Sequence, residues 1–163
     1  MRAHFLLLEA MSHASSTKRP RPAPLYESDL YAWSLEQARL LREGRLDEVD
    51  AENVAEEILD VGSNEYDKLE SALRVLLLHM LKWDHQPDKR SRSWENTIAI
   101  QRRYALRQLR KNPSMKSRTD EAVLEAYDDS RRLASSETDM DLERFPVECT
   151  YDWDTILNRP FKR

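Results

Sequence analysis

The chain has 163 residues, a formal net charge of −4, two glycines and one cysteine. This length is enough for one domain with a buried core, and so few glycines argue against folds built from strands and tight turns. A single cysteine excludes an internal disulfide and a cysteine-based metal knot. Together with the lack of a recognisable secretory signal, it favours a protein of the reducing cytoplasm.

Residues 1–24 are predicted to be a disordered N-terminal extension. The stretch F-L-L-L-E-A-M near the start is too short for a secretory signal, and the proline, serine and basic residues after it are typical of a disordered tail. Translation can start at Met1 or at Met11. We expect the remainder, residues 25–163, to form a single helical-bundle domain.

The first two helices are predicted at residues 28–43 and 51–61. Ser28 or Asp29 can cap the first, and Gly44 suits the left-handed position that ends it. Glycine, serine and asparagine at 62–64 favour a break or kink before the next helix. The apolar residues expected to face the core from these two helices are Leu30, Trp33, Leu35, Ala38, Leu41, Val54, Ile58 and Val61.

The segment from Leu69 to Trp94 is the centre of the predicted fold. Its first part is the most apolar helical stretch of the chain, and such a helix is usually packed on several sides. It is too short and too interrupted to span a membrane, and Pro87 ends it. Apolar residues recur at steps of three and four, which places one stripe on a helix: Leu69, Leu73, Leu76, Leu77, Met80 and Trp83.

Two further helices are predicted, from Ser91 or Ser93 to Lys111 and from Ser117 to Ser135. A strap with a short final helix at 151–157 follows, and its large apolar side chains are expected to pack onto the bundle. The fold class is therefore all-α, a bundle of about five helices with a C-terminal strap. The apolar positions assigned to the last two long helices are Trp94, Ile98, Gln101, Ala105, Leu109, Val123, Leu124, Tyr127 and Leu133.

Several sequence strings together resemble one known family. They are Y-E-S-D-L-Y-A-W-S-L-E-Q-A-R-L-L-R, D-A-E-N-V-A-E-E-I, L-L-L-H-M-L-K-W-D-H-Q-P, R-S-R-S-W-E-N-T-I-A-I-Q-R-R and F-P-V-E-C-T-Y-D-W-D-T-I-L. In this order, from about Tyr26 to Phe161, they are similar to the family called domain of unknown function 29. The resemblance implies an all-helical bacterial protein and carries no established activity. His85 stands where that family typically has an aromatic or hydrophobic residue.

The charge is unevenly distributed along the chain. Residues 82–118 carry eleven basic and three acidic side chains, whereas the segments on both sides are acidic. A basic segment of this kind is either neutralised within the fold or forms an anion-binding face. Arginines beside a tryptophan can hold phosphates and stack a base. The candidates on the basic helix 90–111 are Arg90, Arg92, Trp94, Arg102, Arg103 and Arg107.

Arg74 and His79 are the weak candidates for catalysis. Their spacing, R-x4-H, is similar to the signature of HEPN ribonucleases, in which arginine steadies the phosphate charge and histidine moves a proton. Val75 stands where that family usually has a polar residue. The alternative is a buried imidazole that pairs with a carboxylate such as Glu56 or Glu57.

Carboxylates on adjacent turns of the helix at 51–61 are further binding candidates. Glu52 and Glu56 share one face and Glu57 lies on the next, so a histidine from another helix would complete a metal site. The Glu-x-x-His spacing of di-iron bundles is absent, so neither a metal nor a cofactor is predicted. Ion pairs to Arg74, Arg90 or Arg92 are the expected role of these carboxylates. The Lys82–Trp83 pair is a last binding candidate.

Three functions follow from these features, in order of preference. The first is a non-enzymatic helical protein-interaction module with an unknown protein partner, with a homodimer as one arrangement. The second is an RNA-cleaving enzyme that uses Arg74 and His79. The third is nucleic-acid binding through the basic helix. No membrane association is predicted.

Overall fold

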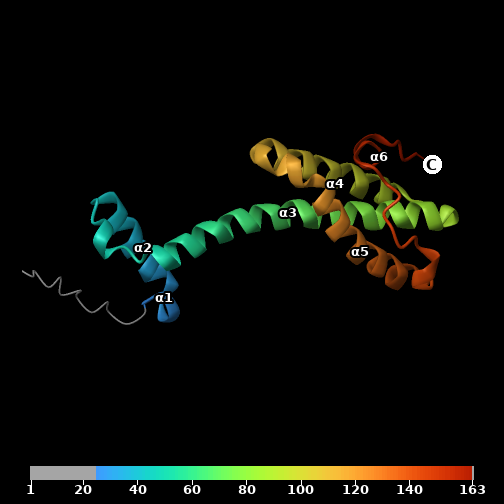
Figure 1. Ribbon diagram of the computed structural model, residues 1–163. Helices are drawn as coiled ribbons and strands as arrows, with labels where there is room; N and C mark the ends of the chain where they lie inside the picture. The colour runs from blue at the N-terminus through green and yellow to red at the C-terminus, as the bar shows by residue number, and fades with distance from the viewer. Residues whose placement is uncertain (1–24, 163) are drawn as a thin grey trace, which may run out of the picture. The chain divides into compact units, whose positions relative to one another are not determined.

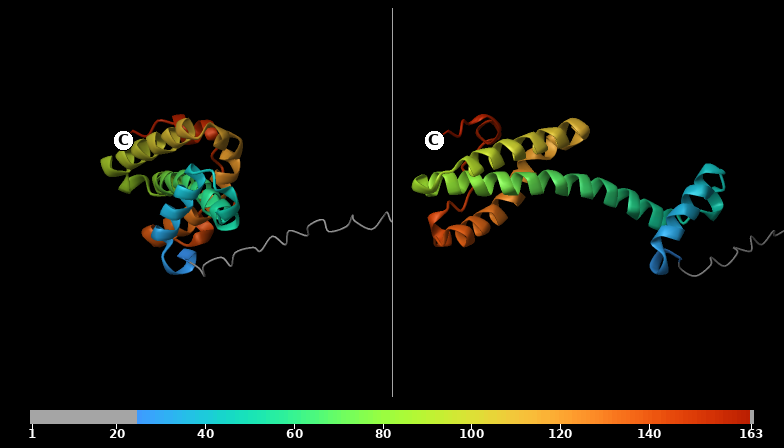
Figure 2. Two further views of the ribbon diagram at one scale, coloured as in Figure 1. Left: turned by 90° about the vertical axis from the view of Figure 1, so that its left-hand side faces the viewer. Right: turned by 180° about the vertical axis from the view of Figure 1, so that it is seen from behind.

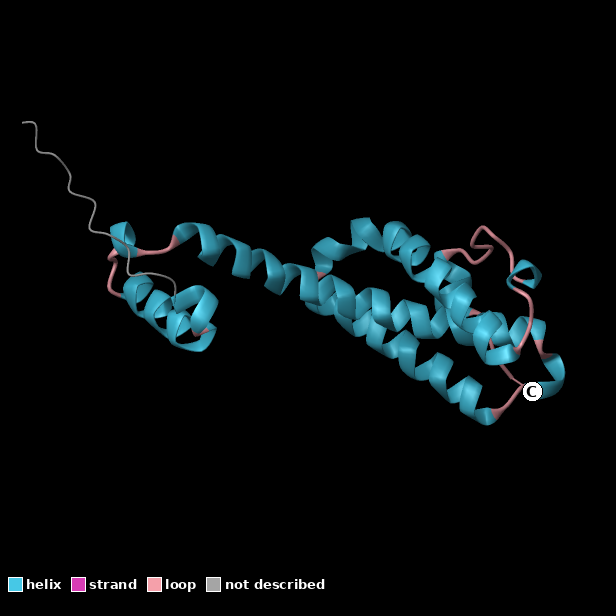
Figure 3. Cartoon of the chain, turned by 90° about the horizontal axis from the view of Figure 1, so that it is seen from below, coloured by secondary structure: helices cyan, strands magenta, loops and turns pink. Residues whose placement is uncertain are grey.

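The computed structural model describes residues 25–162, which form helices and loops without any strand (Figure 1). Figure 3 shows the same described part of the chain coloured by secondary structure. The all-α prediction is confirmed. The predicted disordered extension, residues 1–24, lies outside the described residues. Contacts divide the chain into two compact units, Met1–Val54 and Ala55–Arg163, and the single domain expected from the sequence stays a prediction.

The first unit contains α1 (Leu25–Ser28), α2 (Leu30–Arg42) and a short 3-10 turn at Leu46–Glu48. Asp29 caps α2, because its carboxylate accepts a hydrogen bond from the Ala32 amide at 2.9 Å. Gly44 has a φ of 70°, as the predicted left-handed end of the helix requires.

The apolar face predicted for α2 is partly wrong. Trp33 and Leu40 are buried, but Leu30, Leu35 and Leu41 are 49%, 55% and 46% exposed. Leu35 lies about 200° round the helix from Trp33, so the two cannot share one face. The residues that are buried on α2 follow the helical steps of four and three, namely Trp33, Gln37 and Leu40.

Helix α3 runs from Ala51 to His85 over 35 residues without a break. The break predicted at 62–64 is therefore wrong. Glycine in a helix interior costs only about 1 kcal/mol relative to alanine, which is small beside the rest of a 35-residue helix. Helix α3 ends before Pro87, as predicted.

Two long helices pack along the second half of α3. Helix α4 (Arg92–Lys111) is capped by Ser91, one of the two predicted starting positions, and α5 (Thr119–Thr138) ends three residues later than expected. Figure 1 and both views of Figure 2 show α4 and α5 beside α3. The core stripe of α3 is confirmed: Leu69, Leu73, Leu76, Leu77 and Met80 are all 0% exposed.

Side-chain contacts give the directions of these helices. Tyr66 of α3 donates to Glu125 of α5 at 2.8 Å, and Lys82 of α3 bonds Glu137 further along α5, so α3 and α5 run parallel. Lys111 at the end of α4 bonds Glu65 of α3 at 2.9 Å, so α4 runs antiparallel to both. Of the apolar positions predicted for α5, Leu124 and Leu133 are exposed, because they lie on its outer side.

The C-terminal strap packs onto the bundle as predicted. A 3-10 turn at Leu142–Arg144 precedes α6 (Trp153–Asn158), which Asp152 caps through the Thr155 amide at 2.7 Å. Phe145 and Ile156 are 1% and 0% exposed. None of the described helices is long and apolar enough to cross a lipid bilayer.

Candidate functional site

Arg74 and His79 both lie on α3 but point in different directions. Five residues correspond to about 500° of helix, which leaves the two side chains roughly 140° apart. The Arg74 Nη2 donates to Ser71 Oγ at 3.4 Å, and its Nη1 lies 3.8 Å from Asp129 of α5. The His79 Nδ1 lies 2.8 Å from the carbonyl oxygen of Val75. Each side chain therefore contacts its own surroundings in the bundle.

The pairing of His79 with Glu56 or Glu57 is wrong. Both carboxylates belong to the same continuous helix as His79, and more than twenty residues at 1.5 Å each place them roughly 33 Å away along it. His79 is half-buried instead. Burial lowers the pKa of this imidazole, and the charge of Lys82 lowers it further.

The ion pairs expected between Glu56 and Arg74 or Arg90 are also wrong. The partner of Arg74 is Asp129, and Arg90 donates its Nε hydrogen to the carbonyl oxygen of Trp83 at 2.9 Å. The continuous α3 places Glu56 far from both arginines. Among the described residues, no group of three or more histidine, cysteine, aspartate or glutamate side chains could hold a metal ion.

Lys82 joins the three long helices at one point. Its side chain is buried, its Nζ lies 2.5 Å from Glu137 of α5, and the same nitrogen lies 4.8 Å from the centre of the Trp94 ring on α4. A desolvated ammonium gains from both a carboxylate and an aromatic face. The contacts of Lys82 and Trp94 therefore hold the bundle together.

Trp83, Arg90 and Arg102 hold the C-terminal strap. Trp83 is buried and meets Phe161 edge-on at 5.5 Å, while the Arg90 guanidinium lies 5.1 Å from the Trp83 ring. Arg102 donates from Nε to the carbonyl oxygen of Ile156 at 2.7 Å and stacks on Phe161 at 5.0 Å. Burial lowers the pKa of Arg102. The guanidinium groups of Arg90 and Arg102 are therefore bonded within the fold.

A cluster that the sequence reasoning missed also fastens the strap. Asp84 accepts hydrogen bonds from Arg159 and from the Tyr151 hydroxyl. Burial alone would raise the pKa of Asp84, but these two hydrogen bonds and the Arg159 charge outweigh it and lower the pKa. The available signal was an acid directly after Trp83 in a mainly basic segment, with Tyr151 and Arg159 on either side of the final helix.

The outer side of α4 is different, because its arginines face solvent. Arg103, Arg107 and Arg110 follow one another at steps of four and three, so they lie on one face of α4; we name this set the arginine face. Within the described part of the chain these three have no acidic partner. They line a shallow depression of about 540 Å³ together with Ile100, Tyr104 and Leu106. Arg92, also exposed, lies at the first turn of the same helix.

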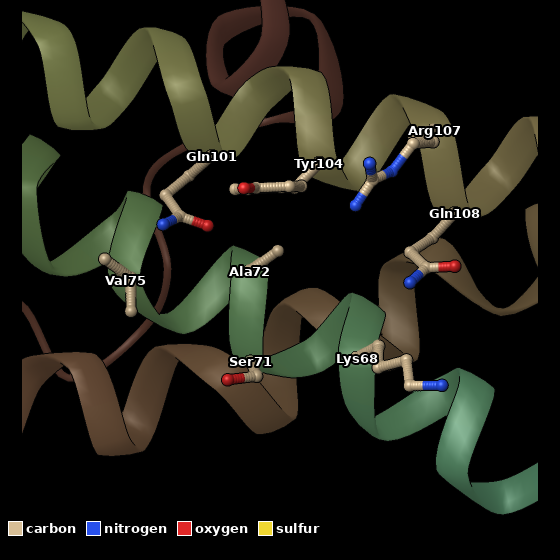
Figure 4. Close-up of a pocket in the computed structure, with 8 residues that line it drawn as sticks. All are labelled: Lys68, Ser71, Ala72, Val75, Gln101, Tyr104, Arg107 and Gln108. Atoms are coloured by element: carbon tan, nitrogen blue, oxygen red, sulfur yellow. The ribbon is translucent and has the colours of Figure 1, made fainter.

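A second, smaller groove of about 320 Å³ separates α3 from α4 (Figure 4). In Figure 4 the guanidinium of Arg107 lies beside the Tyr104 ring, and the distance to the ring centre is 4.8 Å. The buried Oε1 of Gln108 has no hydrogen-bond partner. The groove contains no acid–base pair and is lined by Lys68, Ser71, Ala72, Val75, Gln101, Tyr104, Arg107 and Gln108.

Comparison with known proteins identifies a family. The family model described as domain of unknown function DUF29 matches residues 25–162, which is most of the chain and nearly all of its described part. No curated protein and no solved structure matches this chain. The chain belongs to the DUF29 family, domain of unknown function.

Proposed function

We propose that the chain is a non-enzymatic helical protein-interaction module and that the arginine face of α4 is its binding surface. The observation that carries this proposal is the contrast between two groups of arginines in the basic segment 90–110. Arg90 and Arg102 are bonded within the fold. Arg103, Arg107 and Arg110 are exposed and lack an acidic partner among the described residues, so their charges are available to a ligand.

The apolar residues beside these arginines favour a protein over a nucleic acid. Ile100 and Leu106 are 39% and 38% exposed, and Tyr104 is 44% exposed. Phosphate-binding faces use cations and hydrogen-bond donors and gain little from isoleucine or leucine. Buried apolar and aromatic groups with arginine at the rim are typical of protein interfaces.

The spacing of the charges indicates what kind of protein segment fits. Arg103 and Arg107 are about 6 Å apart along α4, one helical turn. Glutamate or aspartate residues four apart on a partner helix have the same separation. We therefore expect an acidic amphipathic helix that places its apolar side on Ile100 and Leu106.

Two observations make the ribonuclease alternative less favoured. His79 has a lowered pKa and an intrahelical hydrogen bond, and Arg74 has its own contacts with Ser71 and Asp129. A general acid–base pair needs both groups within reach of one substrate atom.

Photo-crosslinking tests the proposed surface. A photoreactive phenylalanine analogue replaces Leu106 in cells, and adducts are examined before and after nuclease digestion. We expect a discrete protein adduct that survives nuclease. It should be lost when Arg103→Glu and Arg107→Glu are added. The same analogue at Leu124, which is 66% exposed on α5, is the matched control.

Nucleic-acid binding is the outcome that would replace this proposal. The purified chain is titrated into labelled single-stranded RNA and duplex DNA at two salt concentrations. Saturable binding that weakens steeply with salt and disappears in the Arg103→Glu/Arg107→Glu variant would assign the arginine face to a phosphate backbone. We expect no such binding.

A further inference from the structure

The groove between α3 and α4 lies beside the arginine face and shares only Arg107 with it. Six of the eight described residues that line the groove carry a side-chain hydrogen-bond donor, and none of the eight carries a carboxylate. In contrast to the depression beside the arginine face, no isoleucine or leucine lines it. Such a lining favours a ligand that accepts hydrogen bonds and carries negative charge.

The charged side chains of the groove gather at one of its ends. Because α3 and α4 run antiparallel, Lys68 of α3 lies opposite Arg107 and Gln108 of α4. Val75 lies opposite Gln101 at the other end, as Figure 4 shows. Seven residues separate the two ends on either helix, which corresponds to about 10 Å. A ligand of this length therefore meets cations at one end and an uncharged amide at the other.

The charges at the cationic end match a dianion. Lys68 and Lys111 share the single carboxylate of Glu65, at 2.7 and 2.9 Å. Hydrogen bonds from Lys68, Lys111 and Asn112 lower the pKa of Glu65 to about 2, so this carboxylate is ionised at neutral pH. The two lysines and the glutamate together keep one positive charge, and Arg107 adds a second. A phosphomonoester carries nearly two negative charges at pH 7, whereas a carboxylate carries one.

Uncharged side chains along the groove provide contacts for the rest of the ligand. Ser71 Oγ accepts a hydrogen bond from Arg74 at 3.4 Å, so the hydroxyl hydrogen of Ser71 can be donated to a ligand. The ring of Tyr104 is 44% exposed and carries a hydroxyl group. Gln108 Oε1 is buried without a hydrogen-bond partner among the described residues, which costs free energy. Rotation of this amide toward a ligand hydroxyl would give the oxygen a donor.

We propose that this groove binds a small polar phosphomonoester, of the size of a sugar phosphate or a nucleotide. The phosphate group lies between Lys68 and Arg107, and the uncharged part of the ligand extends along Tyr104 toward Gln101. This inference goes beyond the proposed function, because it assigns a small ligand to a separate hollow. The purified chain should bind that ligand without any protein partner.

Isothermal titration calorimetry of the purified full-length chain tests the site. The titrants are ribose 5-phosphate, AMP, ribose and inorganic phosphate. We expect saturable binding of at least one phosphomonoester with a Kd below about 1 mM, and binding of ribose and of inorganic phosphate that is weaker by about tenfold or more. Tighter binding of AMP than of ribose 5-phosphate would assign a nucleotide to the groove, and equal or weaker binding of AMP would assign a sugar phosphate.

Substitutions at both ends of the groove locate the bound ligand. Lys68→Gln removes a charge-assisted hydrogen bond and should weaken binding about tenfold, and Gln101→Leu removes a neutral one and should weaken it about fivefold. Neither residue belongs to the arginine face. Arg103→Gln is the matched control, because it removes one positive charge from α4 outside the groove, and we expect its affinity to stay within about twofold of the wild type at physiological salt. Circular dichroism checks that each variant keeps its helices.

The absence of saturable binding of either phosphomonoester would overturn the inference, and so would unchanged affinity in either groove variant. Equal affinity for inorganic phosphate would show an adventitious ion only, because the uncharged part of the ligand would then contribute nothing. Loss of binding in Arg103→Gln would move the phosphate to the arginine face and refute the groove as its site. The photo-adduct from Leu106 does not depend on these results, so the protein-binding surface and the ligand groove can be refuted separately.

Discussion

Arg159 and Asp84 form a two-point ion pair across 75 positions of sequence: Arg159 Nη1 lies 2.8 Å from Oδ2 and Nη2 lies 2.5 Å from Oδ1. The Tyr151 hydroxyl donates to the same Oδ2 at 2.8 Å. Asp84 lies at the end of α3, and its partners lie on either side of α6. The ion pair therefore ties the end of the chain to the central helix.

Asp84→Ala is expected to lower the free energy of unfolding by about 2 kcal/mol, because it leaves a partly buried guanidinium and a hydroxyl without their acceptor. Tyr151→Phe, which removes one hydrogen bond, should cost about 1 kcal/mol. Urea unfolding followed by circular dichroism measures both. Equal stability of Asp84→Ala and the wild type would show that the strap is held by its apolar contacts alone.

Acid should weaken this ion pair. The pKa of Asp84 is held below its ordinary value of 3.8, so the contribution is present above pH 3.8 and is lost as the pH falls through the lower folded-state value. The difference in unfolding free energy between wild type and Asp84→Asn should shrink in that range. A constant difference down to pH 2 would contradict this.

His79 should make stability depend on pH in a second range. Burial lowers the pKa of His79 below its ordinary 6.5, so the unfolded chain binds a proton first and stability falls as the pH drops below 6.5. His79→Gln should reduce the loss of unfolding free energy between pH 7 and pH 5. An unchanged pH profile in that variant would assign the loss to other groups.

Two leucines of the same helix should respond very differently to truncation. Leu73→Ala creates a cavity in the core and should cost about 3 kcal/mol, whereas Leu59→Ala, at a position that is 70% exposed, should cost less than about 0.5 kcal/mol in dilute solution. Urea unfolding at low micromolar concentration measures both. Similar losses at the two positions would mean that Leu59 is buried in solution.

The two glycines should also behave oppositely. An added Cβ at Gly62 meets nothing within 4 Å, so Gly62→Ala should stabilise α3 by about 0.5–1 kcal/mol. Gly44 has a φ of 70°, and Gly44→Ala should destabilise by about 1 kcal/mol because alanine is strained there. Thermal unfolding compares the pair. Destabilisation by Gly62→Ala would point to a kink that needs glycine.

Local patterns predicted much of the fold. The core stripe of α3, the Asp29 cap of α2 and the start of α4 after Ser91 depend on neighbouring residues, which the sequence displays directly. Gly62 was misjudged because its cost of about 1 kcal/mol is small beside the rest of a 35-residue helix. That error also misplaced the carboxylates expected near His79.

Local patterns could not predict which residues distant in the sequence would contact one another. The sequence placed Arg90, Arg102 and Arg103 together in one basic helix, but only the fold separates them, because Arg102 reaches the strap at Ile156 and Arg103 does not. The Asp84–Arg159 pair was missed for the same reason. Which charge is left for a ligand depends on which charges the tertiary structure has already paired.

Hydroxyl-radical footprinting of Tyr104 and Leu106 in nuclease-treated cell extract tests the central claim most directly. If a protein covers the arginine face, both side chains should oxidise several-fold more slowly in extract than in the dilute purified chain. Leu124, exposed on α5, should oxidise equally in both. Equal oxidation of Tyr104 and Leu106 in the two samples, or protection that nuclease removes, would contradict a protein-binding role for α4.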